Sequence, residues 1–155
     1  MNMARTELID NLNKALGLEL AAVIQYSQHS YLVTGHEREV FKGWFRDQAE
    51  EAQDHADKLG DKIVALGGVP AIEPAMIRQS VDLSEMLKQD LELEREALAI
   101  YMAAWGACDD SDLPQKFWLE GQISDEQMHV EELEKLTSER KSRVNSEKII
   151  LREVS

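Results

Sequence analysis

The chain is divided into four long segments of helical periodicity by a few short groups of helix-breaking residues. The groups are Thr34-Gly35-His36, Gly67-Gly68-Val69-Pro70 and the run from Asp109 to Pro114. Only eight Gly and three Pro occur among the 155 residues. Glycine loses much backbone entropy in a helix and proline lacks the N–H donor, so both are rare inside helices. Their scarcity predicts long helices and disfavours a turn-rich sandwich or barrel.

The spacing of the breakers also predicts how the helices are connected. We predict helices at Thr6–Val33, Glu37–Leu66, Leu83–Cys108 and Leu113–Ser142. The first two are joined by a short turn, as are the last two, so each pair should be antiparallel. The long connection over residues 67–81 can carry the chain from one end of a bundle to the other. We therefore predict a single all-α domain, a four-helix bundle over about residues 6–142 with one crossover and a short tail at 143–155.

Acidic residues dominate the charge and narrow the classes of partner. The chain has 30 Asp and Glu against 17 Lys and Arg, a formal net charge of −13. Such a chain suits cations and disfavours nucleic acid, because phosphate binding requires a basic surface. No apolar run reaches the ~18 residues of a membrane span, and Met1–Asp10 lacks the apolar core of a signal peptide. We expect a cytoplasmic protein with no membrane partner and, with one cysteine (Cys108), no intrachain disulfide.

Each predicted helix carries a carboxylate within its apolar stripe. These residues are Glu19, Glu51, Glu94 and Glu126. His55 lies on the same stripe as Glu51, and His129 on the same stripe as Glu126. A buried carboxylate without a partner costs several kcal/mol, so acidic residues rarely occupy core positions. One such residue can result from a misplaced stripe. Four of them, two accompanied by a histidine, predict a polar site inside the bundle.

The carboxylates are also matched in depth. Glu19 and Glu51 each lie 16 residues from the glycine of the first turn, and Glu94 and Glu126 lie 17 before and 15 after Ser111 in the last turn. At about 1.5 Å rise per residue, all four fall within one or two turns of a common level. That level is the middle of the bundle.

Four carboxylates and two imidazoles around one point suit two divalent cations with oxygen and nitrogen ligands. Glu126 and His129 are three residues apart and share a helix face. The second helix departs from this spacing, because Glu51 lies four residues before His55 and Ala52 occupies the third position. Glu50 remains an alternative, although it lies about 140° from His55 around the helix. The predicted ligands are Glu19, Glu51, His55, Glu94, Glu126 and His129.

Several segments resemble the ferritin superfamily, and bacterioferritins most closely. They are Leu18-Glu19-Leu20-Ala21-Ala22-Val23-Ile24-Gln25-Tyr26, His55-Ala56-Asp57-Lys58, Leu66-Gly67-Gly68-Val69-Pro70 and residues 85–94, and the similarity covers about Thr6 to Leu136. The resemblance implies a ferritin-like bundle in which Glu19, His55, Glu94, Glu126 and His129 match ferroxidase ligands. The family's remaining carboxylate falls on Ala52, so Glu51 is the substitute. Tyr26 matches a tyrosine beside the metal centre, either an electron donor or an aromatic core residue with a satisfied hydroxyl.

The same resemblance implies iron storage and detoxification. Two Fe²⁺ per subunit would be oxidised to Fe³⁺ by dioxygen or peroxide, inside a homo-oligomeric shell, usually of 24 subunits. The family's haem ligand is a methionine of the second helix. Gln53 occupies that position, and the predicted second helix contains no methionine. Haem binding through that position is therefore not expected.

Other interpretations remain open at this stage. The bundle could be a di-iron redox enzyme without storage, such as a peroxidase or hydroxylase. It could also be a DNA-protecting miniferritin, although the net charge disfavours this, or a bundle that binds no metal. Outside the predicted site, His29 and His36 are expected to be solvated near the first turn. Trp44, Trp105 and Trp118 are expected to pack in the core or at interfaces.

Overall fold

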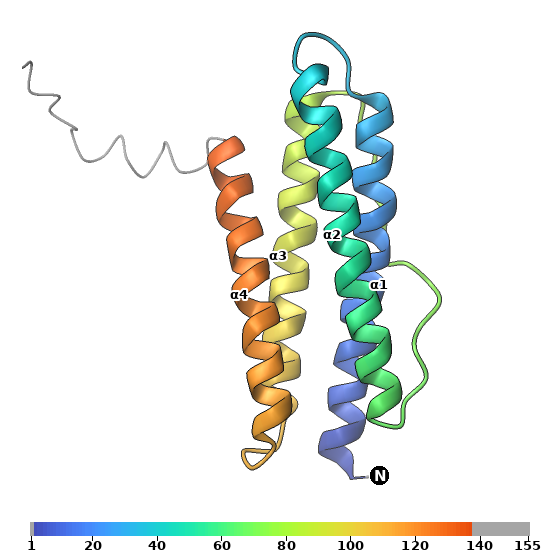
Figure 1. Ribbon diagram of the computed structural model, residues 1–155, viewed down its shortest axis with the longest axis vertical. Helices are drawn as coiled ribbons and strands as arrows, with labels where there is room; N and C mark the ends of the chain where they lie inside the picture. The colour runs from blue at the N-terminus through green and yellow to red at the C-terminus, as the bar shows by residue number, and fades with distance from the viewer. Residues whose placement is uncertain (1, 138–155) are drawn as a thin grey trace, which may run out of the picture.

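The computed structural model describes residues 2–137, which form four long helices (Figure 1). They are α1 (Met3–Leu32), α2 (Arg38–Ala65), α3 (Leu83–Ala107) and α4 (Leu113–Leu136). The described residues contain no strand, so the predicted all-α fold is confirmed. The predicted bounds agree within a few residues, except that the predicted end of the last helix at Ser142 and the tail at 143–155 lie outside the described residues.

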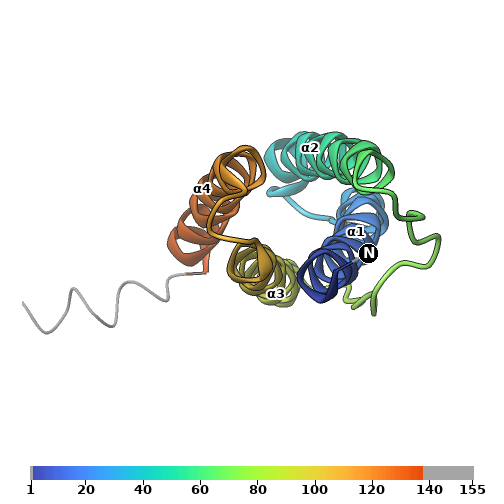
Figure 2. The same ribbon diagram turned by 90° about the horizontal axis from the view of Figure 1, so that it is seen from below.

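The helices form two antiparallel pairs, α1 with α2 and α3 with α4 (Figure 1), and Figure 2 shows the bundle from one end. In this end-on view the helices follow the order α4, α2, α1, α3 around the bundle. α1 packs on both α2 and α3, and α3 packs on α4. By contrast, no Cα atom of α2 lies within 8 Å of a Cα atom of α4. Side chains alone connect those two helices.

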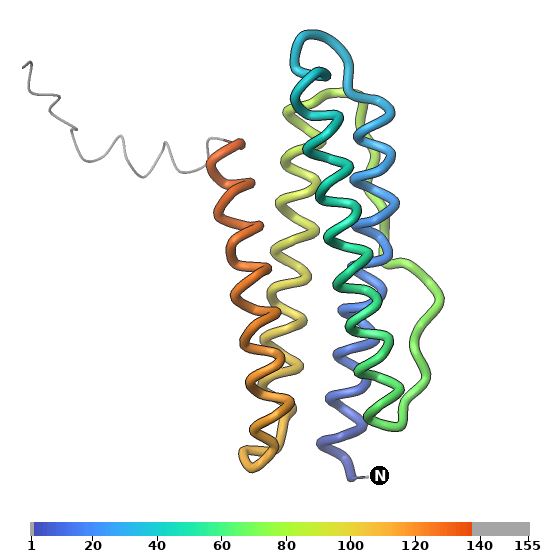
Figure 3. The backbone as a smooth tube through the Cα atoms, viewed as in Figure 1, coloured from blue at the N-terminus to red at the C-terminus, as the bar shows by residue number. Residues whose placement is uncertain are grey.

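The long crossover, residues 66–82, runs along the outside of α1 (Figure 3). Asn13 holds it at two points, donating from its side chain to the carbonyl of Val69 at 3.1 Å and accepting from the N–H of Ala71 at 2.7 Å. Farther along, the N–H of Ala75 donates to the carbonyl of Gly17 at 2.8 Å. A Cβ at Gly17 would lie 3.3 Å from a crossover carbonyl oxygen, so this close approach favours glycine. The predicted end-to-end connection is thereby confirmed.

Helix ends are fixed by local chemistry that the sequence encodes. The side chain of Asn2 accepts from the N–H of Arg5 at 2.8 Å, and Asp82 accepts from the N–H of Glu85 at 2.9 Å. These are N-cap bonds, which satisfy backbone donors that have no partner within the helix. Just after the C-terminal end of α2, Gly67 has φ 88°, a left-handed conformation that residues with a Cβ disfavour.

Replacing Gly67 with Ala should lower the free energy of unfolding by about 1–2 kcal/mol, because the left-handed conformation is retained at a steric cost. Gly60→Ala is the matched control: Gly60 lies inside α2, and nothing lies within 4 Å of a Cβ added there. That variant should gain about 1 kcal/mol in helix propensity. Chemical denaturation measures both. Equal effects of the same sign would contradict this account of the helix end.

The core is built from the inward apolar stripes and contains a polar layer at mid-height. Leu12, Leu59 and Leu91 are among the fully buried apolar side chains. Glu19, His55, Glu94 and Glu126 are also buried, each at 5% exposure or less. The prediction of carboxylates within the apolar stripes is therefore confirmed for three helices. In the described residues, no helix combines the length and apolar character that a membrane crossing requires.

Candidate metal centre

Three helices contribute to a first group of potential ligands in the polar layer. Glu19 comes from α1, His55 from α2 and Glu126 from α4. His55 Nδ1 lies 3.3 Å from Glu19 Oε1 and 3.2 Å from Glu126 Oε1. One ligand atom of each residue lies within 4.8 Å of the others, which is close enough for a single cation.

A second group adjoins the first and shares one of its residues. Glu94 from α3 joins Glu126 and His129 from α4. His129 Nδ1 lies 3.6 Å from Glu94 Oε2 and 3.8 Å from Glu126 Oε2. The two imidazole rings are stacked, with centroids 5.8 Å apart. Glu126 therefore directs one oxygen toward each histidine, an arrangement suited to two neighbouring cations with a shared carboxylate.

Two buried tyrosines orient the outer carboxylates of these groups. Tyr26 donates its hydroxyl hydrogen to Glu94 Oε1 at 2.7 Å, and Tyr101 donates to Glu19 Oε1 at 2.9 Å. Burial raises the pKa of both phenols well above the ordinary value, and the neighbouring carboxylates raise it further. Both therefore remain donors at physiological pH. Tyr101 was missed by sequence reasoning, although it lies on the same apolar stripe as Glu94.

Three buried polar atoms in the centre lack hydrogen-bond partners. They are Oε1 and Oε2 of Glu126 and Nδ1 of His129. Leaving such atoms unpaired in a protein interior costs about 1–3 kcal/mol each, so native cores rarely tolerate them. A cation bound between them would provide the missing partner. The residues present therefore fit a pair of divalent cations.

Protonation compensates the concentrated negative charge in the absence of metal. Burial raises the pKa of the Glu126 carboxyl well above its usual range, and the charges of Glu94 and Glu19 raise it further. Burial also acts to raise the pKa of Glu94, but the adjoining His129 ring prevails and lowers it to about 2. For His129, burial acts to lower the pKa, yet Glu94 and Glu51 raise it to about 9. Burial likewise acts to lower the pKa of His55, but the hydrogen bond and charge of Glu19 prevail and raise it.

Glu51 differs in position from the other predicted ligands. Its side chain is 45% exposed, and its Oε1 lies 2.9 Å from His129 Nε2, the ring nitrogen opposite the shared carboxylate. The expectation that Glu51 is a core-facing residue is therefore wrong. Ala52, one residue later, takes the buried position of α2 at 5% exposure. Glu50 is exposed, as expected. Whether Glu51 binds metal stays a prediction.

Comparison with known proteins places this geometry in context. A family model described as a ferritin-like domain matches residues 9–142. The chain belongs to the ferritin-like family. It is 36% identical over 134 residues to the bacterioferritin of Brucella melitensis, covering 83% of this chain and 81% of that protein. The resemblance drawn from the sequence is thereby confirmed.

Solved structures give the same result for this ferritin-like protein. A ferritin-like, diiron-carboxylate protein from Bacillus anthracis superposes with a TM-score of 0.84 at 33% identity, covering 88% of this chain and 99% of that one. A dodecameric thioferritin from Bacteroides fragilis, described as bacterioferritin-related, gives 0.77 at 26% identity, with 93% and 92% covered.

A second buried polar cluster of this ferritin-like protein was not predicted. His29 was expected to be solvated, and this is wrong: it is fully buried, with Nδ1 3.0 Å from Asp90 Oδ1. Gln25 donates to the same carboxylate at 2.9 Å. Asp90 lies one helical turn before Glu94, and Gln25 one turn before His29. That i, i+4 spacing was the signal that could have revealed the cluster.

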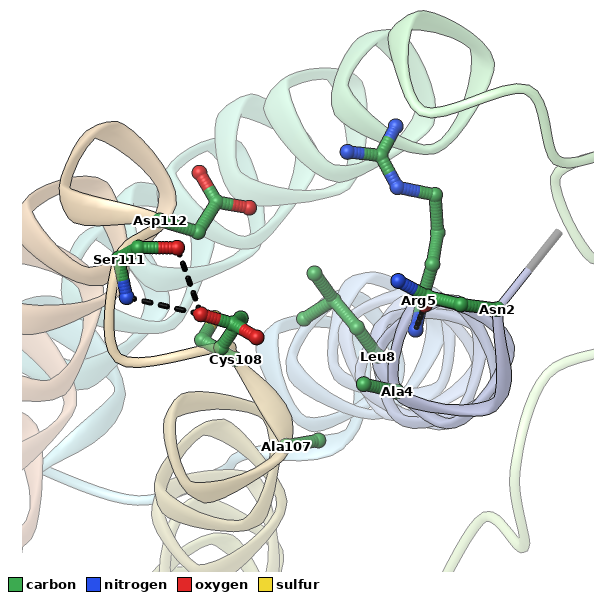
Figure 4. A pocket seen from close by; sticks show the side chains of 9 residues that line it. Asn2, Ala4, Arg5, Leu8, Ala107, Cys108, Ser111 and Asp112 are labelled. Carbon is green, nitrogen blue, oxygen red and sulfur yellow. Dashed lines mark hydrogen bonds between the residues drawn. The ribbon is translucent and has the colours of Figure 1, made fainter.

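Two hollows of the surface differ in their relation to the centre. One, of about 270 Å³, lies between α2 and α4 and is lined by Glu51, Asp125, His129 and Glu132 among others. It adjoins the candidate centre. The other, of about 350 Å³, is formed where α1 begins and α3 ends, and includes Arg5 (Figure 4). This second hollow lies at the end of the bundle and contains none of the predicted ligands.

Metal binding to the centre should become tighter as the pH rises from about 6 to 9. A cation needs the unprotonated forms of Glu126, His55 and His129, whose pKa values are all raised, so it must displace their protons. Each displaced proton gives about a tenfold gain in affinity per pH unit below the pKa of its group. Co²⁺ titration of the apoprotein at several pH values, with proton release measured in weak buffer, checks this. An affinity independent of pH across this range would contradict it.

Proposed function

We propose that this protein binds two Fe²⁺ per subunit as substrates, oxidises them, and stores the ferric product inside an oligomeric shell. The observation that carries the proposal is Glu126, a buried carboxylate shared by two ligand groups with both oxygens unpartnered. Family membership supports the same reaction, because bacterioferritins are relatives at 33–36% identity.

The four buried residues and the partly buried His129 have complementary roles in this proposal. Glu19 and His55 would hold one Fe²⁺, Glu94 and His129 the other, and Glu126 would lie between them. Carboxylates are hard ligands that favour the ferric state, while imidazoles bind Fe²⁺ well. Each Fe²⁺ gives up one electron, and the pair of electrons reduces dioxygen to peroxide or peroxide to water. Tyr26, hydrogen-bonded to Glu94, lies where a further electron could be supplied.

The surface charge supports cation entry. The hollow between α2 and α4 is lined by acidic side chains from both helices, Glu51 from α2 and Asp125 and Glu132 from α4. Acidic side chains around an opening raise the local concentration of cations and increase their rate of arrival. This hollow is the route that we propose for Fe²⁺.

The mass of the assembly distinguishes a shell of 12 subunits from one of 24. The bacterioferritin-related thioferritin is described as dodecameric, whereas the sequence resemblance implies 24 subunits. Twelve or twenty-four copies of a 17.6 kDa chain amount to about 210 or about 420 kDa, which light scattering separates easily. We propose a homo-oligomer of one of these sizes.

The proposed function does not require haem. Gln53, at the position expected for a haem-binding methionine, lies on the exposed face of α2 and donates to Asp57 at 2.9 Å. We propose that no haem is bound through this position. Protein produced with added haem should then show no Soret band after purification.

The decisive experiment is an anaerobic Fe²⁺ titration of the apoprotein, followed by air and by further iron. Saturation at two Fe²⁺ per chain, then aerobic uptake of far more iron that stays with the assembly, supports storage. Saturation at two without further capacity, on a small assembly, favours a di-iron redox enzyme. No saturable binding at all would refute the proposed centre.

A further inference from the structure

We infer that Glu51 is a positioning residue that holds the His129 ring with Nδ1 toward the metal pair, and that it does not itself bind metal. This inference rests on the proposed function. The sequence left open whether Glu51 or Glu50 supplies the carboxylate of α2, and the inference assigns Glu51 a role. It concerns the ferritin-like bundle of this chain, in which Ala52 occupies the inward position of α2.

The two nitrogens of His129 face different surroundings. Nδ1 is buried, has no hydrogen-bond partner, and faces the carboxylates of Glu94 and Glu126 at 3.6 and 3.8 Å. Nε2 lies 2.9 Å from Glu51 Oε1, which is hydrogen-bond distance. A carboxylate can only accept, so the ring must carry a hydrogen on Nε2. When a cation displaces the other proton, the lone pair is left on Nδ1, facing the metal pair.

The position of Glu51 on α2 keeps its carboxylate away from the centre. It contributes no atom to either group of ligand atoms lying within 4.8 Å of one another. Its side chain is 45% exposed and lines the hollow between α2 and α4, so it reaches His129 from the solvent side. The ring of His129 therefore lies between Glu51 and the shared carboxylate of Glu126.

His55 provides an internal comparison. Its Nδ1 faces Glu19 and Glu126, while its Nε2 lies 4.0 Å from Asp125, beyond hydrogen-bond distance. Only one of the two histidines is thus held by an outer carboxylate. The loss of Glu51 should weaken the Glu94–Glu126–His129 site and leave the Glu19–His55–Glu126 site nearly unchanged.

If Glu51 acts as a hydrogen-bond acceptor for His129 and not as a metal ligand, Glu51→Gln and Glu51→Ala should have different effects. The amide oxygen of glutamine can still accept the Nε2 hydrogen, so the ring keeps its orientation. Alanine cannot accept it. Outer carboxylates that orient a histidine ligand typically contribute 10–100-fold to metal affinity. We expect Glu51→Ala to weaken one of two Co²⁺ sites by about 10–100-fold, and Glu51→Gln to weaken it by less than about threefold.

The test is a calorimetric and spectroscopic Co²⁺ titration of the assembled apoprotein, comparing wild type, Glu51→Ala, Glu51→Gln and Glu50→Ala. Glu50 is the matched control, because it is the exposed neighbour of Glu51 on α2. Circular dichroism and assembly size establish that each variant is folded. Weakening of one site in Glu51→Ala alone supports the inference.

Other outcomes are equally decisive. Similar losses in Glu51→Gln and Glu51→Ala would make Glu51 a ligand and overturn the inference. So would wild-type affinity in Glu51→Ala. Two Co²⁺ sites in the wild type support the proposed centre whatever the variants show, whereas a wild type that binds no Co²⁺ would overturn the centre and this inference together.

Discussion

Replacing Glu126 with Gln is expected to abolish rapid Fe²⁺ oxidation while making the apoprotein more stable. Both candidate cation positions depend on this one carboxylate, with Oε1 directed toward His55 and Oε2 toward His129. A neutral amide offers one oxygen and no negative charge, so neither position retains its shared ligand. We expect the initial rate of ferric absorbance to fall on the order of 100-fold or more.

The gain in stability has the same origin as the loss of activity. Glu126 is fully buried beside Glu19 and Glu94, and burial with their charges raises its pKa. An amide is neutral without taking up a proton on folding, so we expect a gain of about 1–3 kcal/mol at neutral pH, measured by chemical denaturation without metal. Glu50→Gln, on the exposed face of α2, should change neither quantity. Normal oxidation by the Glu126→Gln protein would refute the shared-carboxylate centre.

Replacing Asp90 with Ala should destabilise the apoprotein by about 3–5 kcal/mol without touching a predicted metal ligand. The substitution leaves His29 Nδ1 and Gln25 Nε2 buried without their acceptor. Gln25 also accepts from the N–H of Arg78 at 2.9 Å, so the cluster ties the crossover to α1 and α3. Thermal unfolding at fixed protein concentration measures the effect, because assembly changes the apparent stability.

Asp90→Asn is the matched control for this cluster. The asparagine oxygen can still accept from Gln25, so less than half of the destabilisation should remain. The two variants also separate the buried cluster from the metal centre, because Co²⁺ affinity should stay near the wild-type value in Asp90→Asn. A loss below about 1 kcal/mol in Asp90→Ala would show that the cluster contributes little.

The helical architecture could be predicted from the sequence because its determinants are local. Breaker residues such as Gly35 and Gly67 both adopt positive φ, at 83° and 88°, and they mark the helix ends closely. The depth of Glu19, Glu94 and Glu126 followed from the constant rise of a helix, which makes counting along the chain equivalent to measuring along the bundle.

Rotation about the helix axis was less predictable than depth. Glu51 and Ala52 differ by one residue, or about 100° around α2, and this step separates a half-exposed from a buried position. Apolar stripes have soft edges, so they do not fix such an angle. The surroundings of His29 show the same limit, because its burial depends on Asp90 of α3, and the pairing requires the relative rotation of two helices.

Hydrogen bonds between side chains of different helices could not be predicted from the sequence. Tyr26 and Tyr101 both lie on core stripes, but their bonds to Glu94 and Glu19 depend on which helices are adjacent and at what height. Side chains that differ by a single turn in height would find other partners. The sequence therefore predicted which carboxylates and histidines cluster inside the bundle, apart from Glu51, while the packed helices determine how those residues are paired.

The side of the bundle where α2 and α4 meet has a mechanical consequence. In the described residues, no backbone contact joins these helices, and His55 with Glu126, His129 with Glu51, and the Lys62 ammonium 5.0 Å from the Trp118 ring centre span the seam. Cations bound at the centre would cross-link α2 and α4 through ligands from both helices. Metal loading would then also stiffen the subunit, and the metal-free subunit would be least constrained on the side where we propose that Fe²⁺ enters.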